Sequence, residues 1–513
     1  MRNFAKIKNN KYVYFKILFS IYIALTAITS FGQNHKEKVK QTTLFDEIEL
    51  LKKDEDFKHV TWGICVVNVA TDSTIAEYNS EISMIPASTM KVITTAPALS
   101  ILGKNFRFKT LIQYTGNIDK TGTLHGNIYI KGGGDPTLGA YRFDSIMTVA
   151  SIMEQWTDAI LSAGINKIEG AVIGDASIFE DVLIAPNWLF ADIGNYYGAG
   201  ACGLDISENA YTIYFEPSEI EGDSAKIIRI DPEVPDLEII NRVKVGNTSS
   251  KEGNGVWIMG TQYNNQRIME GTIPKNKKTE FEYYGSQPDP SYTCSYLLDK
   301  ALKTACVEIT KAPTTFRILK MKNAITDTLL RKTIFTTYSP TLEDIVYQTN
   351  LRSINVYAEH LLKMMGYIVN NEGGTYSGIK VVRNFWANKG IDLSGFLMED
   401  GSGLSPMNNV TPRHLAEMLR VFTKDSTYTS FYKSLPIGGK TGSLSNILKG
   451  SAAENNLRAK SGYMYGVRSF AGYVKNKKKE QLAFSMIVNN YECKAAEVKK
   501  KFEKLMIKIA ELN

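Results

Sequence analysis

The spacing of apolar residues along the chain changes twice, and this change constrains the fold more than any other feature of the sequence. Short apolar stretches separated by Gly, Pro and Asp turns fill residues 107–325, which is the pattern of consecutive β-strands. Apolar residues on helical spacings lie on both sides of this stretch, at residues 88–102 and after residue 340. We therefore predict one discontinuous domain, residues 42–106 and 326–513, interrupted by a β-rich insertion that forms one or two extra domains.

Strands are also expected at both ends of the chain. Residues 61–69 read as a strand, and residues 71–81 as a turn that leads into a second one. Residues 470–474 and 481–488 read as a hairpin. A closing helix places four apolar residues on one face: Val498, Phe502, Leu505 and Ile509. We expect this face to pack on the core rather than lie on a membrane.

Composition excludes several classes of protein. A length of 513 residues corresponds to two to four folded units, and 43% hydrophobic with 22% charged residues is ordinary for soluble domains. Collagen, coiled coil and wholesale disorder are thereby excluded. Five of the 60 basic residues precede Leu18, which leaves 55 basic against 53 acidic residues in the remainder. We expect no nucleic-acid partner, because such a protein shows a clustered basic surface.

The N-terminus has the pattern of an export signal. Residues 1–16 are basic, residues 17–31 are largely apolar, and Ser30 and Gly32 are small residues ahead of a cut before Gln33. The apolar run is shorter than the ~18–20 residues that span a bilayer as a helix, although an uncleaved anchor is the alternative. We predict a signal peptide over residues 1–32 and a periplasmic or other extracytoplasmic location. No second apolar span follows, so we expect no stable membrane anchor.

The cysteines and histidines predict no metal site. The five cysteines form no C-x-x-C pair and the five histidines no H-E-x-x-H, so we expect neither zinc nor any other cofactor. We expect the cysteines to be core residues or to form an optional disulfide.

The first motif that can carry chemistry is Ser88-Thr89-Met90-Lys91, at the start of the helix expected over residues 88–102. A spacing of three is almost one helical turn, so the hydroxyl and the ammonium lie on one face. A lysine whose pKa is lowered by burial can take the serine proton and make it a nucleophile. In most proteins, however, S-x-x-K is only a capping serine with a surface lysine.

Two further motifs complete the pattern. Ser353 and Asn355 begin a helical stretch, where a hydroxyl could relay a proton and an amide could contact the substrate, although such residues usually cap a helix. Lys-Thr/Ser-Gly occurs twice, at Lys440 and at Lys460. We favour Lys460, with Ser461 and Gly462, because an edge strand is expected there, whereas Lys440 lies in a loop-like run.

Taken together, S-x-x-K, S-x-N and K-S-G resemble the S-x-x-K, S-D-N and K-T-G set of penicillin-binding proteins and class A β-lactamases. The chain is most similar to one family, the class C low-molecular-mass penicillin-binding proteins, which are D-alanyl-D-alanine carboxypeptidases and endopeptidases. The resemblance covers nearly all of the chain after the signal peptide. It rests on Pro86-Ala87-Ser88-Thr89-Met90-Lys91, Gly133-Gly134-Asp135-Pro136-Thr137-Leu138, Tyr196-Tyr197-Gly198-Ala199, Asp400-Gly401-Ser402-Gly403-Leu404-Ser405 and Arg458-Ala459-Lys460-Ser461-Gly462.

The resemblance implies an α/β (α+β) transpeptidase-like, β-lactamase-like catalytic domain, with an antiparallel sheet between helices and inserted domains. It also implies a serine peptidase of peptidoglycan stem peptides that β-lactams inhibit. Ser88 would be the nucleophile and Lys91 its base. Ser353 would shuttle the proton and Asn355 would hold a peptide amide. Lys460 and Ser461 would bind the terminal carboxylate, and the Ser88 and Tyr463 N–H groups would bind the oxyanion.

Three positions qualify the resemblance. Ser461 replaces the commoner threonine but keeps the hydroxyl. Pro406 stands where relatives often have a basic residue, which leaves substrate side-chain recognition open. Asp175 matches an acidic position near the family's cleft, where it would bind an amino group of the peptide stem, or alternatively cap a turn.

Two other functions fit parts of the pattern. A serine β-lactamase shares the acylation residues, but no Glu-x-x-x-Asn loop of the class A type lies between Ser88 and Ser353. A wall-binding protein without catalysis could keep the fold, but the complete set of motif residues argues against it. The sequence decides neither the carboxypeptidase or endopeptidase preference nor the oligomeric state.

Overall fold

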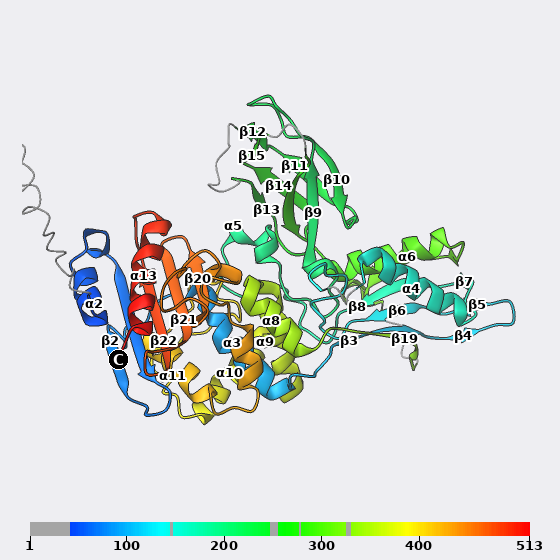
Figure 1. Cartoon of the computed structure of the whole chain (residues 1–513). Coiled ribbons are helices and arrows are strands. Elements are labelled where there is room, and N and C mark those ends of the chain that lie inside the picture. Colours follow the sequence, from blue (N-terminus) through cyan, green and yellow to red (C-terminus); the bar gives the residue numbers. More distant parts are fainter. Residues whose placement is uncertain (1–41, 144–146, 247–254, 276–278, 325–329) are drawn as a thin grey trace, which may run out of the picture.

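The computed structural model describes residues 42–143, 147–246, 255–275, 279–324 and 330–513 (Figure 1). The predicted signal peptide, residues 1–32, lies outside the described residues.

A five-stranded antiparallel sheet joins the two ends of the chain. Its strand order is β2-β1-β22-β21-β20. The first strand, β1, pairs along its whole length with the last, β22, from Thr61 opposite Asn489 to Asn68 opposite Leu482. The bounds are β1 Thr61–Asn68, β2 Thr74–Tyr78, β20 Arg458–Met464, β21 Val467–Lys475 and β22 Gln481–Asn489.

Two helices cover one face of this sheet. α2 (Leu44–Lys52) and α13 (Ala495–Ala510) pack with alternate strand residues such as Ile64, Val66 and Phe484. The four apolar residues expected on one face of the closing helix are all buried there, so the prediction of core packing is confirmed.

The opposite face carries the larger core. The other residues of the same strands, among them Cys65, Val67 and Ile487, point to this side because successive side chains of a strand alternate. The Trp386 Nε1 donates a hydrogen bond to the Ile93 carbonyl at 3.0 Å, which ties α10 to α3. The covering helices are α3 Met90–Leu102, α8 Leu342–Arg352, α9 Asn355–Asn370, α10 Thr375–Asn388, α11 Pro412–Phe422 and α12 Tyr428–Ser434.

The insertion forms two bodies beside this domain (Figure 1). The first has a five-stranded sheet, β18-β8-β6-β3-β19, and a four-stranded one, β17-β7-β5-β4. Its strands are β3 Lys109–Tyr114, β4 Asn117–Ile118, β5 Thr123–His125, β6 Ile128–Lys131, β7 Lys167–Ile168, β8 Val172–Asp175, β17 Glu308–Ile309, β18 Thr314–Thr315 and β19 Lys332–Tyr338. Its helices are α4 Val149–Ser162, α6 Pro290–Thr304 and α7 Phe316–Met321.

The insertion also contains helices, which the prediction of a β-rich stretch did not include. β6 and β8 are parallel neighbours, and a parallel pair needs a long crossover connection. α4 lies in that crossover, and Trp156 from α4 and Leu298 from α6 are buried in one core with the strands.

The second body projects away from the first in Figure 1 and has its own small core, which includes Ile213, Ile258 and Met269. Its strands form three small sheets, β10-β9-β16, β11-β14-β13 and β12-β15. The bounds are β9 Ala210–Phe215, β10 Ile227–Asp231, β11 Glu238–Asn241, β12 Lys244–Gly246, β13 Trp257–Met259, β14 Gln266–Glu270, β15 Thr272–Pro274 and β16 Phe281–Ser286, with the short α5 Phe190–Ile193 beside them.

One expected boundary lies in a different place. The second catalytic segment was expected to begin at residue 326, but β19 pairs antiparallel with β3 in the inserted sheet, from Lys332 opposite Tyr114 to Tyr338 opposite Lys109. Pairing with β3 satisfies the backbone groups of β19, so we propose that the catalytic segment resumes at about residue 339.

All five cysteines are free thiols, and Cys65, Cys202 and Cys294 are buried. Within the part of the chain that the structure describes, no helix is both long and apolar enough to cross a membrane.

The two helices behind the sheet offer a matched pair of phenylalanines. Phe502 is fully buried between α13 and the sheet, whereas Phe45 of α2 is 56% exposed. We expect Phe502→Ala to lower the free energy of unfolding by about 3–5 kcal/mol, through lost apolar contact and the cavity left behind. Phe45→Ala should change it by less than about 0.5 kcal/mol. Urea denaturation of both variants measures the difference, and equal effects would contradict this packing.

Candidate active site

Ser88 lies in a tight turn, not inside an α-helix. The turn is a 3-10 helix, Ala87–Thr89, and α3 begins at Met90, two residues later than expected. Ala87 has a φ of +46°, a strained conformation for a residue with a side chain. The Pro86 carbonyl accepts hydrogen bonds from Thr89 Oγ1 at 2.8 Å and from Ser469 Oγ at 2.5 Å, which fixes the turn against β21.

Lys91 is completely buried beneath Ser88. Its Nζ lies 3.1 Å from Ser88 Oγ, 2.6 Å from Asn355 Oδ1 and 2.7 Å from the Ser402 carbonyl oxygen. The two carbonyl-type oxygens can only accept, so they take two N–H groups of the lysine. In the neutral amine, the remaining position, toward Ser88, holds the lone pair. The geometry therefore suits a lysine that receives the Ser88 proton.

The electrostatics agree with this arrangement. Burial lowers the pKa of Lys91 to about 7, while the carboxylates of Asp400 and Glu359 oppose that shift. A substantial fraction of the Lys91 side chains is therefore neutral at neutral pH.

The Ser402 carbonyl is positioned by a buried loop, residues 400–405. The Asp400 carboxylate accepts hydrogen bonds from the Gly403 and Ser405 N–H groups at 2.7 and 2.6 Å. Glu359 of α9 accepts from the Gly401 and Ser402 N–H groups at 3.1 and 2.7 Å. The sequence string Asp400–Ser405 was assigned no role, because a backbone carbonyl leaves no side-chain signature.

The loop can approach Ser88 closely only because residue 403 is glycine. Gly403 has a φ of +83°, and a Cβ there would lie 1.9 Å from the Ala87 carbonyl oxygen.

Ser353 and Asn355 lie at the junction of α8 and α9. Ser353 ends α8 with a φ of +63°, and α9 begins at Asn355. Asn355 Oδ1 contacts Lys91, and its Nδ2 donates to the Tyr197 carbonyl of the insertion at 2.8 Å. Ser353 Oγ lies 2.9 Å from Lys460 Nζ. The structure therefore brings all three sequence motifs together.

Lys460 lies on β20, the edge strand of the catalytic sheet. Its Nζ donates to Ser353 Oγ and, at 2.7 Å, to the Ser461 carbonyl. Burial, with the nearby charges of Lys91 and Arg468, holds the pKa of Lys460 well below its ordinary value.

Gly462 brings β20 against the Ser88 turn. A Cβ at this position would lie 2.6 Å from the Pro86 carbonyl oxygen and 3.0 Å from the Ser88 nitrogen. Only glycine allows this approach. The next residue, Tyr463, is 57% exposed, and the Arg468 guanidinium lies 5.2 Å from its ring centroid.

Lys440 is placed differently from Lys460. It lies in a turn, and none of the hydrogen bonds among the described residues links its side chain to Ser88 or Ser353. Ser443, which directly follows Lys440-Thr441-Gly442, does reach the site, because its Oγ lies 2.7 Å from Ser461 Oγ. No role was predicted for Ser443, because only the path of the loop brings this residue to β20.

A cavity of about 490 Å³ adjoins these residues. Its walls come from both parts of the chain: Arg142, Tyr196, Tyr197, Glu208 and Ala210 from the insertion, and Leu351, Arg352, Ser353, Ile354, Asn355, Val356, Gly442 and Ser443 from the catalytic part.

Asp175 is not part of this cluster. It ends β8 in the inserted sheet, is 2% exposed, and forms an ion pair with Arg331. It also accepts a hydrogen bond from the Ser177 N–H at 3.0 Å. The carboxylate thus already closes a turn, which was the alternative to binding an amino group.

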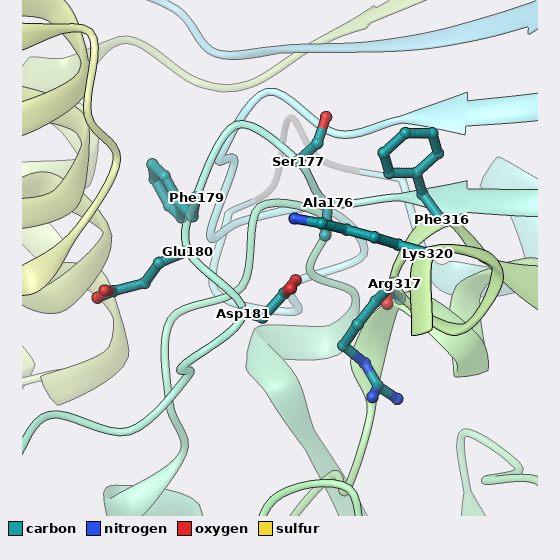
Figure 2. A pocket seen from close by; sticks show the side chains of 10 residues that line it. Ala176, Ser177, Phe179, Glu180, Asp181, Phe316, Arg317 and Lys320 are labelled. Carbon is teal, nitrogen blue, oxygen red and sulfur yellow. The ribbon is translucent and has the colours of Figure 1, made fainter. Parts of the chain in front are cut away.

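The residues that follow Asp175 line a smaller cavity of about 180 Å³, together with Arg317 and Lys320 (Figure 2). Glu180 points away from these two basic residues, and its Oε1 accepts from the Thr375 N–H at 2.8 Å. None of the motif residues lines this cavity. Among the described residues, no group of three or more His, Cys, Asp or Glu is arranged to hold a metal.

Comparisons with known proteins agree with the architecture. The model of the D-Ala-D-Ala carboxypeptidase 3 (S13) family matches residues 44–511. The D-alanyl-D-alanine carboxypeptidase DacB of Haemophilus influenzae is 24% identical over 442 residues, 86% of this chain and 87% of that protein. The D-alanyl-D-alanine carboxypeptidase of an Actinomadura species is 25% identical over 462 residues, 88% of this chain and 81% of that protein.

A solved structure, penicillin-binding protein 4 of Haemophilus influenzae, superposes with a TM-score of 0.76 at 21% identity. The superposition covers 91% of this chain and 99% of that one. The predicted fold class is therefore confirmed.

The role of Glu359 in holding the 400–405 loop can be tested by stability. Glu359→Leu leaves the Gly401 and Ser402 N–H groups buried without an acceptor, and each such loss costs about 1–3 kcal/mol. We expect a clearly lower melting temperature, measured by circular dichroism. Glu372→Leu, at an exposed position beyond the C-terminal end of the same helix, should melt like wild type. Equal melting of both variants would show that Glu359 does not hold the loop.

Proposed function

Because the chain belongs to the D-Ala-D-Ala carboxypeptidase 3 (S13) family, we propose that Ser88 is the nucleophile with which it cleaves the bond after a D-alanine in peptidoglycan stem peptides. The protein is a serine-type D-Ala-D-Ala peptidase. The observation that carries the role of Ser88 is the geometry at Lys91 Nζ. Two fixed acceptors orient the amine so that its lone pair faces the Ser88 hydroxyl.

The reaction begins when Ser88 Oγ attacks the D-alanine carbonyl carbon and its proton passes to Lys91 Nζ. The new Oγ–C bond gives a tetrahedral intermediate. The C–N bond then breaks, and the leaving amine takes a proton through Ser353, which lies between Lys460 and the cavity. Water cleaves the acyl-enzyme and restores Ser88.

The oxyanion binds between the N–H groups of Ser88 and Tyr463. Support for this assignment comes from Gly462, because the absence of a side chain there lets the backbone of β20 lie against the Ser88 nitrogen. A fixed donor of this kind contributes about 3 kcal/mol to the transition state.

Lys460 and the Ser461 hydroxyl bind the terminal carboxylate of the substrate. Asn355 holds Lys91 and retains one free position on each of its amide atoms, since only one contact is made by Oδ1 and one by Nδ2. Those positions can receive a peptide amide of the acyl group. We propose no substrate contact for Asp175, which is engaged by Arg331.

β-Lactams present a strained amide beside a carboxylate and should acylate Ser88. A structure of the Haemophilus protein in complex with a β-lactam superposes with a TM-score of 0.71. We propose that this chain also binds β-lactams and that they acylate it, after export to an extracytoplasmic space where peptidoglycan lies. A β-lactamase would differ by releasing the acyl group quickly, and a non-catalytic relative would not react.

The proposed nucleophile is tested with benzylpenicillin. We expect wild type to gain one acyl group that persists for hours, detected by intact mass, and Ser88→Ala to gain none. The matched serine control is Ser445→Ala, at a position three residues after Gly442. This variant should be acylated like wild type. Adduct on Ser88→Ala would refute the assignment, whereas fast penicillin consumption without a lasting adduct would favour a β-lactamase.

The lowered pKa of Lys91 predicts the pH dependence of acylation. A lysine is cationic below its pKa and neutral above it, so the base is lost as the pH falls through about 7. We expect the second-order rate constant for benzylpenicillin acylation to rise with pH and level off above that value. Stopped-flow measurement over about two pH units on either side checks this. A rate that stays constant on the acidic side would mean that Lys91 is not the base.

A further inference from the structure

Asp400 is a fully buried carboxylate at the start of the loop of residues 400–405. Among the described residues, four uncharged groups donate hydrogen bonds to it: the Gly403 N–H at 2.7 Å, the Ser405 N–H at 2.6 Å, Trp188 Nε1 at 2.8 Å and Asn408 Nδ2 at 2.9 Å. Each carboxylate oxygen accepts two of these bonds, which suits the ionised form, because a protonated acid would need an acceptor. Since all four donors are neutral, Asp400 keeps a full negative charge beside the site.

One peptide group connects this charge to Lys91. Its N–H, that of Gly403, donates to Asp400 Oδ1 at 2.7 Å. Its carbonyl, that of Ser402, accepts from Lys91 Nζ at 2.7 Å. The peptide bond is trans, so the N–H and the carbonyl point in opposite directions. Because hydrogen bonds in a chain polarise one another, the carboxylate makes the carbonyl oxygen a stronger acceptor.

The charge matters most at the step in which Lys91 becomes a cation. In the proposed function, on which this inference rests, the Ser88 proton passes to Lys91 Nζ and converts the neutral amine into an ammonium. The Ser402 carbonyl then accepts a hydrogen bond from a cation, and such a bond is stronger than one from a neutral amine. Burial lowers the pKa of Lys91, and the Asp400 charge acts against burial by favouring the protonated form.

We propose that Asp400 is a positioning residue that stabilises the Lys91 ammonium through the peptide group between Ser402 and Gly403. In a Ser-His-Asp triad, a buried aspartate stabilises the cationic base through a direct hydrogen bond. In this chain a peptide group lies between the carboxylate and the base, so the charge acts without direct contact. The arrangement strengthens the base, whereas a direct ion pair would hold Lys91 in its protonated form.

Two other ionisable groups lie close to Lys91. The Glu359 carboxylate of α9 also favours the protonated lysine, but by less than Asp400 does. Burial, together with the charge of Asp400, raises the pKa of Glu359. On the other side, burial and the charge of Lys91 lower the pKa of Lys460 on β20. Loss of the Asp400 charge therefore makes Glu359 more acidic, and the Glu359 carboxylate replaces part of the missing charge.

The pH dependence of acylation tests the proposal. Stopped flow follows the acylation of Ser88 by benzylpenicillin, and the midpoint of the rise in rate with pH reports the pKa of Lys91. We expect Asp400→Asn to move this midpoint about half to one pH unit lower, because the ammonium loses a stabilising charge. The plateau rate should fall about tenfold, since the amine is then a weaker base.

The matched control is Glu399→Gln, which removes one negative charge from the residue directly before Asp400. Glu399 Oε2 accepts a hydrogen bond from Asn187 Nδ2 at 2.9 Å and has no part in the peptide contact to Lys91. We expect the midpoint and the plateau rate of this variant to equal those of wild type. A shift as large as that of Asp400→Asn would overturn the proposal.

A measurement on wild type does not depend on how well Asp400→Asn folds. Four glycines follow a serine in this chain: Gly378, Gly395, Gly403 and Gly462. Labelling the carbonyl carbon of serine and the nitrogen of glycine therefore restricts the NMR spectrum to four amide signals. The signal of Gly403 is the one that Ser402→Ala lacks.

We expect the Gly403 amide proton of wild type to move downfield as the pH falls through the acylation midpoint. Protonation of Lys91 polarises the peptide group and strengthens its hydrogen bond to Asp400. In Lys91→Met the signal should not move with pH. The Gly378 signal, from α10, is the internal reference.

A midpoint in Asp400→Asn that stays in place or moves to higher pH would overturn the proposal, because a loop that is only loosened admits water and raises the pKa of Lys91. A Gly403 signal that does not titrate in wild type would overturn it as well. Failure of the proposed function looks different, since wild type would then form no penicillin adduct on Ser88 or show no rise in rate through about pH 7.

Discussion

The structure depends on the burial of one amine. Lys91 Nζ is held by the Asn355 side chain, the Ser402 carbonyl and the Ser88 hydroxyl, which come from three distant parts of the sequence. Removing a cation from water is unfavourable, so burial shifts this lysine toward its neutral form. The burial that costs free energy is therefore also what leaves the amine neutral, and able to accept a proton, at neutral pH. Every element that carries one of these acceptors must be rigid for the site to work.

α9 supplies much of that rigidity. Asn355 at its start contacts Lys91, and Glu359 one turn later holds the loop of Ser402. Further along, His360 bridges Asp205 at 3.0 Å and the Gly134 carbonyl at 2.9 Å, and Lys363 donates to the Val182 carbonyl at 2.6 Å. One helix thus fastens the insertion to the catalytic centre through buried polar contacts. The insertion in turn contributes the Tyr197 carbonyl and a wall of the cavity.

Side-chain motifs were visible in the sequence, and backbone contributions were not. One helical turn placed Lys91 beside Ser88, and the expectation of an edge strand separated Lys460 from Lys440. The Ser402 and Tyr197 carbonyls could not be predicted, because any residue type offers a carbonyl. Ser443 was missed because its contact depends on the path of a loop. In the insertion, α4 and α6 were not predicted because the short strands dominate the sequence pattern. β19 lies in the inserted sheet because it pairs with the edge of β3.

The pairing of β1 with β22 has a consequence for biogenesis. In the catalytic sheet, β1 pairs with β22, although almost the whole described chain separates them. Contacts between residues so far apart in sequence form late and slowly. The proposed nucleophile, Ser88, is synthesised early, but the edge strand with Lys460, Gly462 and Tyr463 comes near the end. An incomplete chain therefore has Ser88 without the proposed oxyanion donor and the proposed carboxylate site. Hydrolysis by the proposed site can begin only after translation of the polypeptide is nearly finished, which makes completeness of the chain a condition for activation.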